Sequence, residues 1–113
     1  MKDVQVGEMS VSPRVIESII KAASANIEGL HSLTVGNATR HVARVVPIPQ
    51  PCAVDVSAQG SDVCLGIHID VYAGYSLPDV ANNVRRISAE AVTSQLGLNV
   101  RQVDVYVEAL VQQ

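Results

Sequence analysis

The stretch VCLGIHIDVYAGYSLPDVANNVRRISAEAVTSQLG, residues 63–97, joins a strand pattern directly to a helix pattern. In its first part every second residue is apolar, and side chains two apart along a strand share one face. The apolar face consists of Val63, Leu65, Ile67, Ile69 and Val71, and the other face of Cys64, Gly66, His68, Asp70 and Tyr72. We therefore predict a strand with one buried face and one mixed face that meets water or a second layer.

The second part of this stretch carries the signals of a helix. Ala73–Ser76 breaks the alternation, and Leu77-Pro78-Asp79 suits a first helical turn, because proline has a helical φ and lacks an N–H, and Asp79 favours the positive end of the helix. Apolar residues then recur at helical spacing, at Val80, Val84, Ile87, Ala91 and Leu96. We expect the helix to end at Gln95 or Leu96, with Gly97 in a left-handed conformation behind it, and to pack against the strand.

The N-terminal part predicts a weak strand and then a helix. The alternation of Val4, Val6, Met9 and Val11 is interrupted by Gly7, which favours an edge strand. Ser12 and Pro13 have the character of a cap and a first helical residue, and the apolar stripe behind them is Ile16, Ile19, Ile20, Ala23 and Ile27. This helix is expected to stop at Glu28, because Gly29 suits the position after a helix end.

The segment from Leu30 to Pro51 lacks periodicity, and its prolines at 47, 49 and 51 exclude a central strand or a helix. We predict a long loop there, with Val42–Val46 as a candidate short strand and with a stiff stretch at the three prolines. Beyond it, Ala53–Ser57 alternates again and runs through a turn-rich segment into the strand that begins at Val63, which predicts an antiparallel hairpin. After Gly97 a last strand is predicted, with Val103, Val105 and Val107 on one face. Val100 is out of phase with them, which indicates either a bulge or a strand that starts later.

Together these elements predict one domain over residues 1–113, in the order strand, helix, strand, strand, helix, strand. Each helix has one apolar stripe, and the strands alternate. The expected fold is therefore α+β, with two helices packed on one face of a small, mainly antiparallel sheet.

Composition excludes several classes of function. The net charge of −3 and pI near 5.4 give no basic field for nucleic acid. The element order resembles RNA-binding plaits and KH domains, but their stacking aromatics and basic Gly-x-x-Gly clamp are missing. The N-terminus has no signal-peptide pattern, and no stretch approaches the roughly 20 apolar residues that span a bilayer. We expect a cytoplasmic protein without direct membrane insertion, with Cys52 and Cys64 as reduced thiols.

No recognisable catalytic set is present. The sequence has no nucleophile elbow, P-loop, dinucleotide fingerprint or zinc-protease motif. His68, Asp70 and Tyr72 share a strand face and offer acid–base groups, but polar residues on an outward strand face are also the ordinary pattern of a half-solvated sheet. His31 and His41 lack a second metal ligand nearby in the sequence. We expect no enzymatic activity, no metal and no cofactor.

Two basic clusters are candidates for contact with a partner or an anion. Arg40 and Arg44 lie in the proline-rich loop, and Arg85 and Arg86 lie off the apolar stripe of the second helix. Pro47 and Ile48 belong to the stiff part of the loop, which loses little entropy on docking. The alternatives are a solvated loop that packs over its own domain, and arginines that pair with neighbouring acidic residues.

Three segments together resemble the alkaline shock protein family of bacterial cell-envelope stress response proteins. The resemblance covers about residues 4 to 110 and rests on Val11–Ile16 with the run to Leu30, on Val63–Ala81, and on Leu96–Val100 with Val103–Glu108. The loop from His31 to Pro51 and the Ala73-Gly74-Tyr75 turn depart from the family's usual pattern.

The resemblance implies a non-enzymatic, cytoplasmic protein-interaction module in cell-envelope stress response or homeostasis, without a cofactor. In some relatives a small membrane-anchored protein is the partner that holds the module beneath the membrane, and self-association is a further expectation. The alternative from the residues themselves is a regulatory domain that senses an anionic small metabolite through its arginines.

Overall fold

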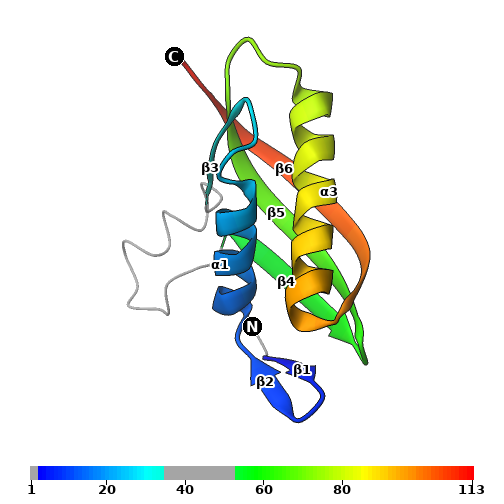
Figure 1. Ribbon diagram of the computed structural model, residues 1–113. Coiled ribbons are helices and arrows are strands. Elements are labelled where there is room, and N and C mark those ends of the chain that lie inside the picture. Colours follow the sequence, from blue (N-terminus) through cyan, green and yellow to red (C-terminus); the bar gives the residue numbers. More distant parts are fainter. Residues whose placement is uncertain (1–2, 35–52) are drawn as a thin grey trace, which may run out of the picture.

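A computed structural model of the chain describes residues 3–34 and 53–113. The elements, in order, are β1 (Val4–Val6), β2 (Met9–Val11), α1 (Pro13–Ser24), β3 (Leu30–Leu33), β4 (Val54–Gln59), β5 (Asp62–Tyr72), α3 (Leu77–Leu96) and β6 (Asn99–Val111). The two helices lie side by side and cover one face of the main sheet, while the β1–β2 hairpin extends beyond the start of α1 (Figure 1). The predicted α+β class with both helices on one face is therefore confirmed.

Strand β5 is the centre of the sheet, because every other strand of that sheet pairs with it. One edge of β5 is shared by two antiparallel partners: β4 pairs with Asp62–Ile67, and β3 with Ile69–Val71. The other edge pairs along its whole length with β6, which runs parallel to β5. A parallel neighbour needs a crossover connection, and α3 provides it.

The core lies between the helices and β5. All five predicted apolar residues of β5 are buried, and Ile16 and Ile20 of α1 are fully enclosed against them. In α3 the buried residues are Val80, Val84, Ser88 and Val92. The stripe therefore follows a spacing of four, and Ile87 and Ala91, which we expected at its centre, lie half-buried on its flank.

The first predicted strand is instead a hairpin. Val4 pairs with Val11 and Val6 with Met9 in an antiparallel ladder. Gly7 has a φ of 60°, which a two-residue hairpin turn requires and which glycine adopts at no steric cost. The glycine that appeared to interrupt one strand therefore joins two.

Helix α1 ends earlier than predicted. It stops at Ser24, whose buried hydroxyl donates to the carbonyl of Ile20, rather than at Glu28. Gly29 does have a positive φ, of 89°, but its carbonyl accepts from the N–H of Tyr72, so it leads into a strand. A Cβ at Gly29 would lie 2.8 Å from the ring of Tyr75, so this position also needs glycine for close packing.

We predicted a loop from Leu30 onward, but the structure has a strand, β3, at its start. Leu30–Leu33 pairs with β5, with a register shift at His31. The remainder of that predicted loop, residues 35–52, lies outside the described residues.

The other local predictions are confirmed. β4 and β5 form the expected antiparallel hairpin. Ser76 caps α3, and Gly97 adopts the left-handed conformation after Leu96. The register of β6 shifts between Val100 and Gln102, which is the bulge that the phase of the valines indicated.

Candidate functional site

The sheet face opposite the helices carries most of the polar side chains of the strands. We call it the open face. It is formed by Cys64, Gly66, His68, Asp70 and Tyr72 of β5, with Asp55 of β4 and Asp104, Tyr106 and Glu108 of β6. No helix or strand of the described residues covers it (Figure 1). Its groups come from three strands, so it is the place where the fold brings distant parts of the sequence together.

His68 joins two carboxylates across the open face. Its Nδ1 lies 2.8 Å from Oε2 of Glu108, and its Nε2 lies 3.0 Å from Oδ2 of Asp55. A neutral imidazole has only one N–H, whereas the charged ring can donate to both acceptors. Partial burial disfavours that charge, but the hydrogen bonds that the ring donates to Glu108 and Asp55, together with their negative charge, outweigh it and raise the pKa of His68 above 6.5.

This arrangement differs from the acid–base cluster that the sequence suggested. His68 is bound by Asp55 and Glu108, and no interaction joins it to Asp70. Oδ1 of Asp70 is buried without a hydrogen-bond partner among the described residues. Because both nitrogens of His68 already face a carboxylate, the ring does not present a free base to a substrate. The cluster links β4, β5 and β6.

Tyr106 lies flat against His68, with ring centroids 4.8 Å apart and planes 20° from parallel. Gly66 lies beneath this ring, and a Cβ there would be in ordinary van der Waals contact with Cε2 of Tyr106 at 3.4 Å and with Cβ of Asp55 at 3.5 Å. Tyr106 is nevertheless 47% exposed, and Val107 and Leu110 of the same strand are 37% and 55% exposed. The C-terminal half of β6 therefore exposes an aromatic ring on the open face and aliphatic side chains on the helix side.

The backbone of β6 has one unpaired edge within residues 3–34 and 53–113, because β5 is its only partner there. Backbone groups of successive strand residues point to opposite edges. On β5, the N–H groups of His68 and Tyr72 donate to Ala53 and Gly29, so the even-numbered residues face β4 and β3. Its odd-numbered residues therefore face β6.

The register then decides which groups of β6 point outward. In a parallel ladder, a residue whose backbone groups face the other strand bonds to the two residues on either side of its opposite partner. Leu65 is opposite Val103 and Ile67 is opposite Val105, so these β5 residues bond to the even-numbered residues of β6. The N–H and C=O groups of Val103, Val105 and Val107 consequently face away from β5. Consistent with this, the carbonyl of Val103 accepts a hydrogen bond from Nε of Arg85 at 3.0 Å.

The two predicted arginines of α3 are exposed, as expected, but their contacts differ. Arg85 binds the carbonyl of Val103 and also Oδ1 of Asn82 at 2.6 Å, so it fastens α3 to the edge of β6. Arg86 lies near Asn83 and Glu90, at 3.4 and 3.9 Å. The structure does not bring them together as one anion clamp. Sequence reasoning did not identify the roles of Asp55, Glu108 and Tyr106.

The predicted loop residues Arg40, Arg44, Pro47 and Ile48 lie outside the described residues. Their contact with a partner or an anion therefore stays a prediction.

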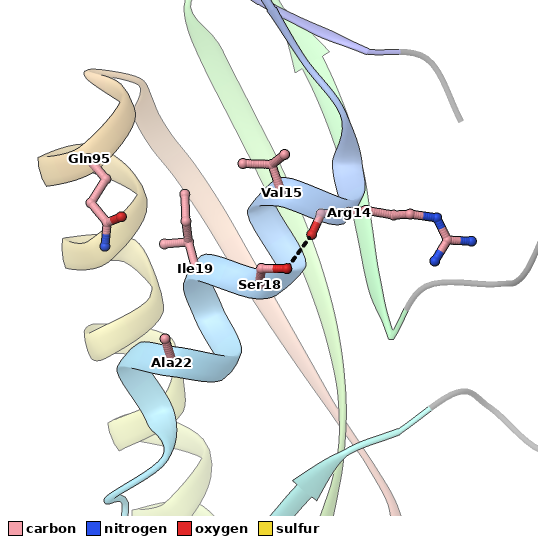
Figure 2. Close-up of a pocket in the computed structure, with 6 residues that line it drawn as sticks. All are labelled: Arg14, Val15, Ser18, Ile19, Ala22 and Gln95. Atoms are coloured by element: carbon pink, nitrogen blue, oxygen red, sulfur yellow. Dashed lines mark hydrogen bonds between the residues drawn. The ribbon is translucent and has the colours of Figure 1, made fainter.

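A second surface feature is an open groove of about 380 Å³ between α1 and the last turn of α3. Figure 2 shows Val15, Ile19 and Ala22 along α1 facing Gln95, while the side chain of Arg14 points away from them. The Ser18 hydroxyl donates to the carbonyl of Arg14 at 3.0 Å, so it is part of the helix's own bonding. The groove offers an apolar surface and no reactive group.

Two further properties bear on function. In the described part of the chain no group of three or more His, Cys, Asp or Glu side chains is arranged to hold a metal ion. None of its helices is both long enough and apolar enough to cross a membrane.

The comparison with protein families covers almost the whole chain. Residues 1–112 match the model of the alkaline shock protein 23 family, whose description is a cell envelope-related function. This chain belongs to that family. The resemblance carried by the capped helix, the central strand and the last strand is confirmed. The family is not a known enzyme family.

One similar protein and two similar solved structures bear on the fold of this chain. An uncharacterized protein of Streptococcus pyogenes serotype M6, Spy1535, is 26% identical over 106 residues, which are 94% of this chain and 81% of that protein. Among solved structures, the manganese form of a MamM CTD variant matches with a TM-score of 0.52 and 12% identity over 87% of this chain and 99% of that one. Another MamM CTD variant matches with a TM-score of 0.51 and 13% identity over 86% and 94% of the two chains. At these identities the likeness concerns the fold alone.

Proposed function

We propose that this protein is a non-enzymatic interaction module of a cell envelope-related process, and that a protein partner pairs a strand with the outer edge of β6. The observation that supports the proposal most is this edge, on a strand of 13 residues that is paired on one side only among the described residues. Unpaired strand edges are templates for another strand, and main-chain hydrogen bonds supply the affinity.

Side chains along the same edge favour the same function. Val107 and Leu110 are exposed apolar residues on the helix side, and Tyr106 presents an aromatic ring on the open face of the same strand. Aromatic and aliphatic side chains that are exposed next to an unpaired backbone are typical of interfaces. A partner strand would cover both features at once. We place the module on the cytoplasmic side of the envelope, where a membrane-anchored partner would hold it at the membrane.

Site-specific photocrosslinking in the producing cells tests this proposal. A photoreactive residue replaces Val107 at the β6 edge or, as a matched control, Val15 in the α1–α3 groove; both are exposed valines, at 37% and 45%. We expect a discrete protein adduct from position 107 and none from position 15.

A second arm tests the backbone. With the photoreactive residue at Leu110, the adduct should disappear in a Val107→Pro background, because proline removes the outward N–H. Adducts only from position 15 would move the partner to the helices and refute the edge. No adduct from any position would refute the interaction module.

A further inference from the structure

We propose that the strand accepted by β6 is basic and amphipathic, with Lys or Arg on alternate residues and aliphatic residues between them. This inference rests on the proposed function and names the chemistry of its partner. It follows from the two different rows of side chains that β6 presents to a neighbouring strand.

Beyond Arg101, which lies beside Cys64, the row of β6 side chains on the open face is acidic. Asp104 and Glu108 flank Tyr106 on β6, and Asp55 and Asp70 lie on the neighbouring strands of the same face. His68 is bound between Asp55 and Glu108, so it offsets part of this charge from within the face. Among residues 3–34 and 53–113, the hydrogen-bond donor to Asp104 is the neutral amide of Gln102, at 3.0 Å, and no basic side chain pairs with this carboxylate there. Side chains of an added strand on this side would meet carboxylates and an exposed aromatic ring, which Arg and Lys complement.

The row on the helix side is apolar. Val103, Val105 and Val107 point to this side, where Val103 is buried and Val107 is exposed. Side chains of an added strand that point the same way would extend this row. The two faces of a strand alternate with a period of two. A partner that fits both rows therefore alternates basic and aliphatic residues.

Arg85 sets where pairing begins. Its guanidinium already binds the carbonyl of Val103 and places a positive charge there. The outward groups of Val105 and Val107 lie beyond it and have no partner in the described residues. A basic strand thus pairs from Val105 toward the C-terminal end of β6, away from Arg85 and alongside Glu108.

The same charges argue against a second copy of this chain as the occupant. An antiparallel pair of β6 strands in one continuous sheet would put Asp104 and Glu108 of both chains on one face. Like charges that face each other across a strand pair are destabilising. The occupant is therefore another protein whose charge is opposite.

The test uses three synthetic peptides of equal length with the full chain. The first alternates Arg or Lys with Val or Ile, the second replaces its basic residues with Glu, and the third scrambles the first so that the alternation is lost. Binding is measured by fluorescence anisotropy, and the bound strand is located by amide hydrogen exchange. We expect the alternating basic peptide to bind about tenfold more tightly than the other two, with an affinity that falls as salt is added.

Variants locate the interaction. The amides of Val105 and Val107 should become protected when the basic peptide binds, and Val107→Pro should abolish binding. Asp104→Asn should weaken binding about threefold, since one exposed ion pair is lost. Glu90→Gln is the matched control, because it removes an exposed carboxylate from α3 and should leave binding unchanged.

The outcomes separate this inference from the proposed function. Equal or tighter binding of the acidic peptide would overturn the basic partner, while proline-sensitive crosslinks at β6 would keep the strand addition. Binding of the basic peptide that protects other amides would also overturn the inference. A homodimer that crosslinks through position 107 would overturn the inference as well.

Discussion

The direction of the backbone groups on β6 predicts that proline substitutions will alternate in their cost. Asp104 points its N–H toward β5, where the register makes the carbonyl of Leu65 the acceptor, whereas Val107 points its N–H outward. Proline removes this donor and places its ring where the hydrogen was. Asp104→Pro should therefore break the ladder, and Val107→Pro should leave it intact.

The magnitude follows from the burial of the acceptor. Leu65 is 2% exposed, so its carbonyl would lose its partner without gaining water. A buried unsatisfied group costs about 1–3 kcal/mol, and the clash of the ring with β5 adds to this. We expect Asp104→Pro to cost about 2–4 kcal/mol more than Asp104→Ala. At roughly 4 °C per kcal/mol for a domain of this size, the melting temperature should fall by about 8–16 °C.

Val107→Pro should lie within about 1 kcal/mol of Val107→Ala, because proline is tolerated on an edge strand when its N–H faces solvent. The alanine variants remove the side-chain contribution from each comparison. Thermal unfolding followed by circular dichroism, and denaturant unfolding, measure both differences. Equal costs at the two positions would refute the assignment of the outward groups and remove the basis for strand addition at β6.

Three further changes test other parts of the fold. Gly29→Ala should destabilise the protein by about 2–4 kcal/mol in denaturant unfolding, because φ is 89° and the new Cβ meets Tyr75. Gly97→Ala should cost only about 1 kcal/mol, because φ is 72° but the space around it is open. Equal costs would contradict the packing role of Gly29. Ser88→Ala should be neutral or stabilise by up to about 1 kcal/mol, because the buried hydroxyl has no partner in the described structure; a clear loss on the same assay would reveal a hidden bond. His68 has a raised pKa in the folded state, so its contribution to stability is fully present below pH 6.5 and is lost as the pH rises through the folded-state pKa. The free energy of unfolding, measured from about pH 5 to 9, should therefore fall in the wild type relative to His68→Gln. A rise with pH would contradict the raised pKa.

Local periodicity predicted the long elements of this fold. The alternation of β5 and the caps at Ser76 and Gly97 each depend on neighbours in the sequence, and the structure confirms them. Strand β3 was missed because Leu30–Leu33 is too short and too mixed to show a period. It exists because the edge of β5 beyond β4 is available, which is a property of the tertiary structure.

Which residues meet on the open face depends on the register between the strands. His68 meets Asp55 and Glu108, which are 13 and 40 positions away in sequence. Which residues stand opposite one another is decided by the hairpin turn and by the parallel pairing with β6. A bulge moves Glu108 into place, since the register shifts between Val107 and Ala109. A pattern along one strand cannot contain this information.

The parallel pairing of β5 with β6 also sets an order of folding events. The β4–β5 hairpin closes between Gln59 and Asp62, so its contacts are local and form quickly. Asn99 must instead reach Asp62 across 37 positions, with α3 between them, so this pairing costs more chain entropy and forms more slowly. During refolding, the amides of the β4–β5 ladder should gain protection before those that face β5 from β6. The strand that presents the outer edge is thus assembled after the hairpin that it pairs with, so the edge exists only once the β4–β5 hairpin has formed.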